Sequence, residues 1–246
     1  MKRALLFANN YRGDDALRGC VNDARELARV LRRRGFRVTI RTEFGRDRFL
    51  SDLAAAAREA SGGDEVFVAY SGHGVSVPDR SGDESDGLDE AMYCADGRLV
   101  IDDEIAYVLR TFPENCRVRM LMDCCHSGTI GDLPFEWDER CGTCTPAGRT
   151  CTPAGGQGGQ GGRGGWGDRD VMVISGCTDT QESADAYDRK RGRYMGALTS
   201  AFVDNEARAS DTRALVSGIR ASLAARRMQQ VPVLTSTREN IEAFLA

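Results

Sequence analysis

The sequence has only two histidines, His73 and His126, beside nine cysteines, so chemistry that needs an imidazole must use one of these two positions. Each histidine follows an apolar run typical of a buried strand, within Tyr70-Ser71-Gly72-His73-Gly74 and Asp123-Cys124-Cys125-His126-Ser127-Gly128. If the two strands are parallel neighbours, their carboxyl ends align and His73 lies opposite Cys125. A thiolate beside an imidazole that accepts and later returns a proton supports acyl transfer. The spacing therefore predicts a cysteine nucleophile with a histidine base.

The choice between the two histidines favours His73. His126 is adjacent to Cys125 in sequence, and neighbouring side chains on an extended segment diverge. Backbone N–H groups of the segment Gly72-His73-Gly74 and of Cys125 are candidates for an oxyanion hole, because glycine lets the backbone approach a substrate carbonyl closely. Spacing alone selects no carboxylate to orient His73. The alternative is a pair of small buried thiols at a strand end, which is the commoner fate of cysteine.

The elements that must position these residues alternate between strands and helices. Apolar runs predict strands and apolar residues at helical spacing predict helices, which together favour a parallel sheet covered on both faces. Asp96-Gly97 indicates a hairpin between two short apolar arms. Val231 to Leu234 is expected to be an edge strand, since an edge tolerates Pro232. The other predicted strands are 4–8, 37–41, 65–70, 117–122 and 170–175, and the predicted helices are 21–34, 47–60, 105–112, 195–209 and 212–227.

One segment interrupts this pattern. Residues 141–168 contain an imperfect repeat, Cys-Thr-Pro-Ala-Gly, followed by a tract of glycine and glutamine. Such a composition cannot bury enough apolar surface to order itself. We therefore expect a single domain over 1–246, with a larger region 1–140, a flexible linker 141–168 and a smaller region 169–246 that shares the same sheet.

Composition excludes several functional classes. The chain has 33 basic and 37 acidic residues, a net charge of −4, so no global field attracts nucleic acid or an anionic membrane. No apolar run is long enough for a membrane span, and the first residues are too short an apolar stretch for a signal peptide. These features predict a cytoplasmic protein without nucleic-acid or membrane partners, whose cysteines are reduced thiols, catalytic thiols or metal ligands.

Three further motifs do not support a metal or RNA-binding site. Cys141-x-x-Cys144 with Cys151 lacks the second Cys or His pair that a zinc site needs. The run 79–90 has the length of an EF-hand loop, but Glu84 stands where that loop requires glycine. A single Arg-Gly-Gly in the glycine-rich tract is more typical of a linker than of an RNA-binding segment.

Several ordered motifs at compatible spacing extend over most of the chain. They are Leu17–Ala24, Tyr70–Gly74, Gly82–Glu90, Ile101–Ile105, Asp123–Thr129, Asp132–Phe135 and Ser175–Asp185. With these motifs the chain resembles the metacaspases, caspase-like cysteine peptidases with a large-subunit (p20) and a small-subunit (p10) region. The resemblance implies an α/β fold, a caspase-like three-layer αβα sandwich with a mostly parallel central sheet. No prodomain precedes the first predicted strand, so recruitment through one is not expected.

The resemblance implies a catalytic dyad of His73 and Cys125, with the backbone amides of Gly74 and Cys125 holding the oxyanion. It also implies cleavage after arginine or lysine, unlike caspases. The sequence is consistent with a cationic P1 side chain. Asp123 precedes Cys125 by two positions and can therefore line a pocket beside it, and a carboxylate pairs well with arginine. Spacing alone favours an exposed helix position for Asp23. Only the resemblance places Asp23 in the substrate pocket. The implied S1 pocket, which receives the P1 side chain, consists of Cys20, Asp23, Ser71 and Asp123.

Calcium is the cofactor that the resemblance implies. Its ligands would be aspartates, which supply the hard oxygen atoms that Ca²⁺ prefers and which repel one another until a cation arrives. The alternative is a solvated acidic loop without a metal. The implied ligands are Asp89, Asp102, Asp103 and Asp132.

Arginines in the linker suggest self-cleavage, because a peptidase that cuts after arginine can act on its own exposed chain. The family also implies a monomer that acts on protein or peptide substrates. Two other functions stay open: a catalytically silent scaffold with the same fold, and a peptide ligase that resolves the acyl-enzyme with an amine. The candidate self-cleavage sites are Arg140, Arg149, Arg163 and Arg169, with 189–193 as a second region.

Overall fold

An eight-stranded sheet forms the middle of the molecule in the computed structural model, which describes residues 1–78, 87–125, 133–138, 143–146, 165–176 and 185–245. Its strand order is β2-β1-β3-β7-β10-β13-β8-β9. The first five strands in this order are mutually parallel, and β13, β8 and β9 pair antiparallel. The strands are β1 (Lys2–Ala8), β2 (Arg37–Thr42), β3 (Glu65–Ser71), β7 (Arg117–Asp123), β8 (Phe135–Asp138), β9 (Thr143–Pro146), β10 (Asp170–Ser175) and β13 (Val233–Ser236).

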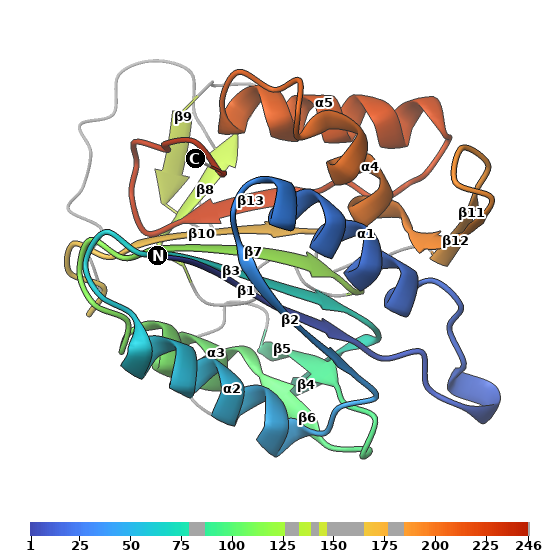
Figure 1. The fold of residues 1–246 in the computed structure, drawn as a ribbon, viewed down its shortest axis with the longest axis horizontal. Coiled ribbons are helices and arrows are strands. Elements are labelled where there is room, and N and C mark those ends of the chain that lie inside the picture. Colours follow the sequence, from blue (N-terminus) through green and yellow to red (C-terminus); the bar gives the residue numbers. More distant parts are fainter. Residues whose placement is uncertain (79–86, 126–132, 139–142, 147–164, 177–184, 246) are drawn as a thin grey trace.

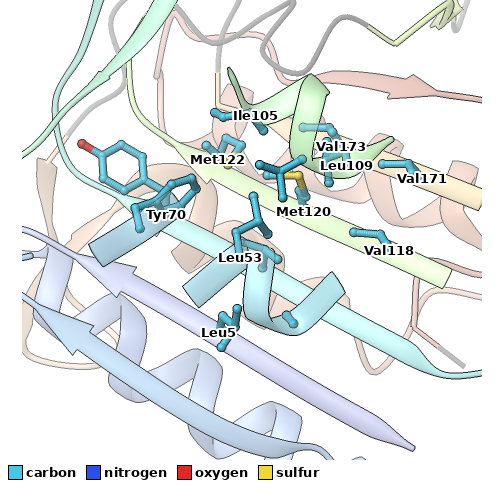
Figure 2. Close-up of a cluster of buried hydrophobic side chains, with 14 of the residues drawn as sticks. Leu5, Leu53, Tyr70, Ile105, Leu109, Val118, Met120, Met122, Val171 and Val173 are labelled. Carbon is cyan, nitrogen blue, oxygen red and sulfur yellow. The ribbon is translucent and has the colours of Figure 1, made fainter. Parts of the chain in front are cut away.

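Helices cover both faces of this sheet, which gives three layers (Figure 1). On one face lie α1 (Cys20–Arg33), α4 (Ala197–Asn205) and α5 (Thr212–Ala225); on the other lie α2 (Arg46–Glu59) and α3 (Asp102–Leu109). Each face has its own hydrophobic core. Figure 2 shows the core beneath α2 and α3, where Leu5, Val118 and Met120 from the strands meet Leu53 and Leu109 from the helices. Strands with apolar residues on both faces form such a doubly covered sheet.

The predicted alternation of strands and helices is confirmed. The structure reproduces the predicted strand 170–175, and it places β7, β3 and β1 within one or two residues of their predicted ends. Gly35 ends the first helix with a φ of +84°, a conformation that side chains disfavour. The Asp96-Gly97 turn joins the antiparallel strands β5 (Leu88–Tyr93) and β6 (Leu99–Ile101), which form a second sheet with β4 (Gly74–Pro78).

Two predictions about the carboxyl-terminal half are wrong, and two strands there are missed. The segment near Val231 is not an edge strand, because β13 lies between β10 and β8 and Pro232 precedes it. Met195 belongs not to a helix but to β12 (Arg193–Gly196), which pairs with β11 (Asp185–Asp188) in a separate hairpin. The strands β8 and β9 were not predicted. Short strands such as these carry too few residues for a periodic signal.

The predicted linker 141–168 is structured at both ends. Residues 143–146 form β9, and Trp166 is buried in the core beneath α3 with the Arg110 guanidinium 4.8 Å from its ring centroid. The Arg169 guanidinium donates to the carbonyl oxygens of Phe112 (2.9 Å) and Trp166 (3.0 Å). A single tryptophan buries enough apolar area to anchor a glycine-rich segment, which composition averaged over 28 residues does not reveal.

A buried ion pair joins the two central strands. Arg119 on β7 is fully buried and donates to both carboxylate oxygens of Asp170 on β10, at 2.8 and 2.9 Å. A planar guanidinium satisfies a carboxylate in this bidentate way. β7 comes before the segment 147–164 in the chain and β10 comes after it. The ion pair therefore links the parts of the chain before and after that segment within one sheet. In the described part of the chain, no helix is both long and apolar enough to cross a membrane.

Candidate active site

His73 and Cys125 follow two neighbouring strands of the central sheet at the same edge. β3 and β7 are parallel, and Ser71 pairs with Asp123 in their register. His73 and Cys125 therefore each come two positions after one of these paired residues. The amide of Gly72 donates to the carbonyl of Asp123 at 3.4 Å and continues this pairing beyond the strands. The predicted parallel pairing is therefore confirmed, and it places the imidazole-bearing and thiol-bearing segments side by side.

The doubled cysteine divides into an inner and an outer thiol. Cys124 is 1% exposed and belongs to the core beneath α2 and α3, whereas Cys125 is half-buried. Successive side chains on an extended segment point to opposite sides. Cys125 is therefore the more accessible of the two thiols, and Cys124 fills the core.

The His73 imidazole is oriented by a backbone carbonyl. Its Nε2 lies 2.8 Å from the carbonyl oxygen of Asp15, in the short 3₁₀ turn Gly13–Asp15. Because a carbonyl only accepts, Nε2 carries the hydrogen and Nδ1 keeps the lone pair that can accept a proton. Sequence reasoning considered only a carboxylate for this role and did not find the Asp15 carbonyl. A backbone carbonyl is present in every residue, so the sequence gives no signal for it.

Gly74 lies directly against the backbone after β7. A Cβ atom at this position would be 1.9 Å from the carbonyl oxygen of Cys125 and 3.3 Å from the Cβ of Cys124. No side chain fits into that space. The neighbouring amides are engaged elsewhere, that of Gly72 with Asp123 and that of His73 with the Tyr11 hydroxyl. Gly74 is thus a position where the backbones of the two segments approach too closely for any side chain.

A cluster of buried carboxylates adjoins these residues. Asp23 is 0% exposed, and its carboxylate accepts hydrogen bonds from the Ser71 hydroxyl (2.6 Å) and the Gly196 amide (3.0 and 3.1 Å). Asp123 accepts from the Thr199 amide at 2.8 Å. The two carboxylates converge at Gly196, where an added Cβ would lie 2.1 Å from Asp123 Oδ2 and 2.9 Å from Asp23 Oδ2.

The titration of Asp23 reflects this crowding. Burial, and then the neighbouring carboxylates of Asp123 and Asp185, hold the pKa of Asp23 well above its usual range. Burial and the Asp23 carboxylate likewise raise the pKa of the Cys20 thiol, which stays protonated. The structure thus brings together all four residues of the predicted pocket, Cys20, Asp23, Ser71 and Asp123, and corrects the exposed position that spacing alone suggests for Asp23.

A model of the caspase domain matches residues 1–241 of the chain. The chain is 30% identical to Metacaspase-1 of Mycosarcoma maydis over 96% of its length and 70% of that protein, and 29% identical to Metacaspase-3 of Trypanosoma brucei brucei over 96% and 71%. Metacaspase-1 of Cryptococcus neoformans is 32% identical over 82% of the chain and 54% of that protein. The chain belongs to the metacaspase family. It spans about half to seven tenths of the length of these metacaspases.

Solved structures support the same fold. The metacaspase chain superposes on a Geobacter sulfurreducens protein with a TM-score of 0.70 at 27% identity, over 100% of this chain and 97% of that one. Caspase-1 of Spodoptera frugiperda gives a TM-score of 0.65 at 15% identity, over 99% and 89%. The predicted caspase-like sandwich with a mostly parallel sheet is therefore confirmed, and the chain is a member of a cysteine peptidase family.

The carboxylates proposed to hold calcium in this metacaspase lie between β5 and the start of α3. Asp89 and Asp102 are buried, and Asp102 accepts from the amides of Glu90 and Asp103, both at 2.9 Å. Burial, with Asp89 and Asp103 nearby, raises the pKa of Asp102 to about 6. Among the described residues, no group of three or more His, Cys, Asp or Glu has the geometry of a metal site. The fourth predicted ligand, Asp132, lies outside the described residues.

The candidate self-cleavage sites fall mostly outside the described part of the metacaspase: Arg140, Arg149 and Arg163 all do. Arg169 is half-buried and bonded to two carbonyls, which opposes its use as a P1 residue. Arg191 in the second candidate region pairs with Asp188 (2.7 Å) and Asp204 (2.9 Å). Arg169 and Arg191 are therefore engaged in the fold, whereas Arg189 in the same second region is exposed.

Sequence reasoning missed Asp185, a third carboxylate beside Asp23 and Asp123. It begins β11, accepts from the Arg18 amide at 2.7 Å, and its Oδ1 is a buried atom without a hydrogen-bond partner among the described residues. A Cβ on Gly19 would lie 2.4 Å from that oxygen. Asp185 stands at the end of a motif used for the resemblance, but only the β11–β12 hairpin brings it beside α1.

Proposed function

We propose that the chain is an endopeptidase that cleaves after arginine, and less often lysine, through an acyl-enzyme on Cys125. The observation that carries the proposal is the Asp23 carboxylate. It is fully buried, its recorded hydrogen-bond donors are a neutral hydroxyl and a neutral amide, and a second carboxylate two residues before the thiol converges on the same glycine. A buried carboxylate without a cation is unfavourable, and a P1 guanidinium supplies that cation.

The first chemical step is the transfer of a proton from the Cys125 thiol to His73 Nδ1. The thiolate then attacks the carbonyl carbon of the scissile bond, and the negative charge moves to the carbonyl oxygen. Backbone amides of Gly74 and Cys125 are the proposed donors to this oxyanion. The close approach of these two segments, enforced by the absence of a side chain at Gly74, supports this role.

Collapse of the tetrahedral intermediate breaks the carbon–nitrogen bond. The imidazolium returns its proton to the leaving amine, and the acyl group stays on the sulfur as a thioester. His73 then accepts a proton from water, the hydroxide attacks the thioester, and the thiol leaves with the proton. The Nε2–H bond to the Asp15 carbonyl supports this cycle because it keeps the imidazole in one tautomer throughout.

Specificity for a P1 cation is tested with fluorogenic peptides that end in arginine, lysine, citrulline or aspartate. Citrulline matches arginine in size but carries no charge. We expect turnover of the arginine peptide by the wild type, a loss of at least about 100-fold with citrulline, and none with Cys125→Ala. Equal turnover of arginine and citrulline would refute the charge-based pocket, and turnover by Cys125→Ala would refute the nucleophile.

Calcium is proposed as an activating ion at Asp89, Asp102, Asp103 and Asp132. The chemistry of the donors suits Ca²⁺, because carboxylate oxygens are its preferred ligands, and Asp89 and Asp103 lie near enough to raise the pKa of Asp102. The ion would neutralise these carboxylates and tie β5 to the start of α3. Calorimetric titration with calcium should show binding to the wild type and at least about tenfold weaker binding to Asp102→Asn, with Asp64→Asn on the surface as control. No heat with the wild type would remove the proposal.

Self-cleavage is proposed at Arg140, Arg149 or Arg163 rather than at Arg169. The linker composition and the proposed arginine specificity support it. Intact-mass analysis of the purified wild type should show two fragments and that of Cys125→Ala one chain. An active enzyme that stays full-length would refute it.

A monomer is also proposed, because β8 and β9 continue the main sheet beyond β13 and leave that strand no edge for a second copy. Light scattering of the wild type tests this, and a dimer mass would refute it.

A further inference from the structure

The phenol ring of Tyr11 lies against the His73 imidazole. The two ring centroids are 4.7 Å apart and the planes are inclined by 36°. We propose that Tyr11 is a positioning residue, whose ring and hydroxyl hold His73 with Nδ1 toward Cys125 and whose π face stabilises the imidazolium form. This deepens the proposed function and rests on the dyad of His73 and Cys125.

The Tyr11 hydroxyl fixes the backbone of His73. It accepts a hydrogen bond from the His73 amide at 2.9 Å and donates to the carbonyl of Tyr93 at 2.6 Å. The Tyr70 hydroxyl, 2.9 Å from that of Tyr11, donates to the His73 carbonyl at 2.7 Å. Figure 2 shows the Tyr70 ring in the core with its hydroxyl directed away from the neighbouring side chains. Both backbone polar groups of His73 are therefore tied to phenols.

The backbone of Tyr11 is strained in a way that delivers the ring to this place. Its φ is +55°, a conformation that a bulky residue rarely adopts. The Glu43 carboxylate stabilises it by accepting from the amides of Asn10 (2.8 Å) and Tyr11 (3.2 Å). Strain of this kind persists only where the surroundings enforce it, and it gathers at functional sites. Here its consequence is the contact between Tyr11 and His73.

The electrostatic setting gives the ring a role beyond packing. In the described part of the chain, the recorded partners of the imidazole ring are the Asp15 carbonyl and the Tyr11 ring, and neither is charged. The titratable groups on the surrounding elements are phenols, thiols and carboxyls. They are the phenols of Tyr11, Tyr70 and Tyr93, the thiols of Cys124 and Cys125, and the carboxyls of Asp14, Asp15, Glu43 and Asp123. Burial raises the pKa of the Tyr11 phenol, so the ring stays neutral. A neutral π face stabilises an adjacent cation.

This arrangement predicts the direction of a pH shift. Stabilising the imidazolium favours transfer of the proton from the Cys125 thiol to His73, so the thiolate forms at lower pH. Removal of the ring should therefore move thiolate formation at Cys125 to higher pH. For a half-buried contact the expected displacement is about 0.7 pH unit, which converts to about 1 kcal/mol.

The test measures alkylation of Cys125 by iodoacetamide as a function of pH, followed by peptide mass spectrometry, because this readout needs no substrate turnover. Tyr11→Leu removes the ring, and Tyr11→Phe removes only the hydroxyl. Tyr107→Leu, at a tyrosine on α3 that is 72% exposed, is the matched control. Melting temperature and circular dichroism establish that each variant is folded.

We expect the alkylation midpoint to move to higher pH in Tyr11→Leu and to stay unchanged in Tyr11→Phe and Tyr107→Leu. Turnover of the arginine peptide should show a kcat lowered about tenfold in Tyr11→Phe with KM unchanged, since one oriented hydrogen bond is lost. If Tyr11→Leu does not fold, the Tyr11→Phe result decides alone. A wild-type midpoint and kcat in a folded Tyr11 variant would overturn the proposal.

Failure of the proposed function is distinguishable from failure of this inference. A ring-dependent alkylation midpoint without cleavage of any peptide would support the role of Tyr11 and remove the peptidase. A wild-type Cys125 that reacts like an ordinary thiol, with a midpoint near about pH 8.5, would overturn both.

Discussion

Replacement of Asp23 by asparagine should stabilise the protein and abolish its preference for arginine. The carboxylate is fully buried and its pKa is held well above the usual range, chiefly by burial and then by Asp123. Asparagine keeps the shape and an oxygen that can accept from Ser71 and Gly196, but it carries no charge. The substitution therefore separates the electrostatic role of this side chain from its hydrogen bonds.

The sign of the stability effect follows from linkage. A carboxyl whose pKa is raised on folding binds more protons in the folded than in the unfolded state, so the free energy of unfolding falls as pH rises above the unfolded pKa. The loss is about 1.4 kcal/mol for each pH unit traversed up to the folded pKa. Asp23→Asn removes this loss, and we expect its free energy of unfolding at pH 7.5 to exceed that of the wild type by at least about 1 kcal/mol.

The effect on substrate binding has the opposite sign. Loss of one partner from a buried charge pair costs about 3 kcal/mol, which is about 150-fold in kcat/KM for an arginine peptide. In the wild type, binding of the P1 cation requires the ionised Asp23. Below its raised pKa, affinity for the arginine peptide should therefore fall about tenfold per pH unit, and affinity for the citrulline peptide should stay level.

The first assay is urea unfolding over a range of about pH 5 to pH 9. The second is the measurement of KM for the arginine and citrulline peptides over the same range. Asp47→Asn is the control, since Asp47 lies in the first turn of α2 on the surface. A less stable Asp23→Asn that still turns over the arginine peptide at the wild-type rate would refute the reasoning. Asp23 would then be a structural hydrogen-bond acceptor and not the reader of the P1 charge.

Three further substitutions test the fold and the site. Arg119→Met leaves the buried carboxylate of β10 unpaired and should lower the free energy of unfolding by about 3–5 kcal/mol in urea titrations, whereas Arg98→Met at an exposed pair should cost under about 1 kcal/mol; equal costs would contradict the buried pairing. Gly74→Ala places a Cβ 1.9 Å from a carbonyl oxygen and should abolish peptide turnover, while Gly62→Ala, whose nearest neighbour would be 3.5 Å away, should keep it; full turnover by the first variant would rule out the close approach. Trp166→Ala should lower the free energy of unfolding by about 3–5 kcal/mol by calorimetry; no change would mean that the end of the glycine-rich segment is not anchored.

Local patterns were sufficient for much of this molecule. The buried runs that became β1, β3, β7 and β10 carry no polar residue on either face for most of their length, and this identifies strands buried on both sides without an alignment. Residue rarity led to the proposed dyad, because the chain has only two histidines. Turn chemistry located the Asp96-Gly97 hairpin.

The amino-acid sequence by itself determined the five described helices and the parallel strands of the main sheet, which residues carry a thiol or an imidazole, and the family. Only the tertiary structure decided that Asp185, 162 positions after Asp23 in the chain, lies beside it, that a carbonyl of Asp15 orients His73, and that the Tyr11 ring packs on the imidazole. The physical reason is that short hairpins, backbone acceptors and strained turns have no periodic side-chain signature. They become visible only when distant segments are packed against one another.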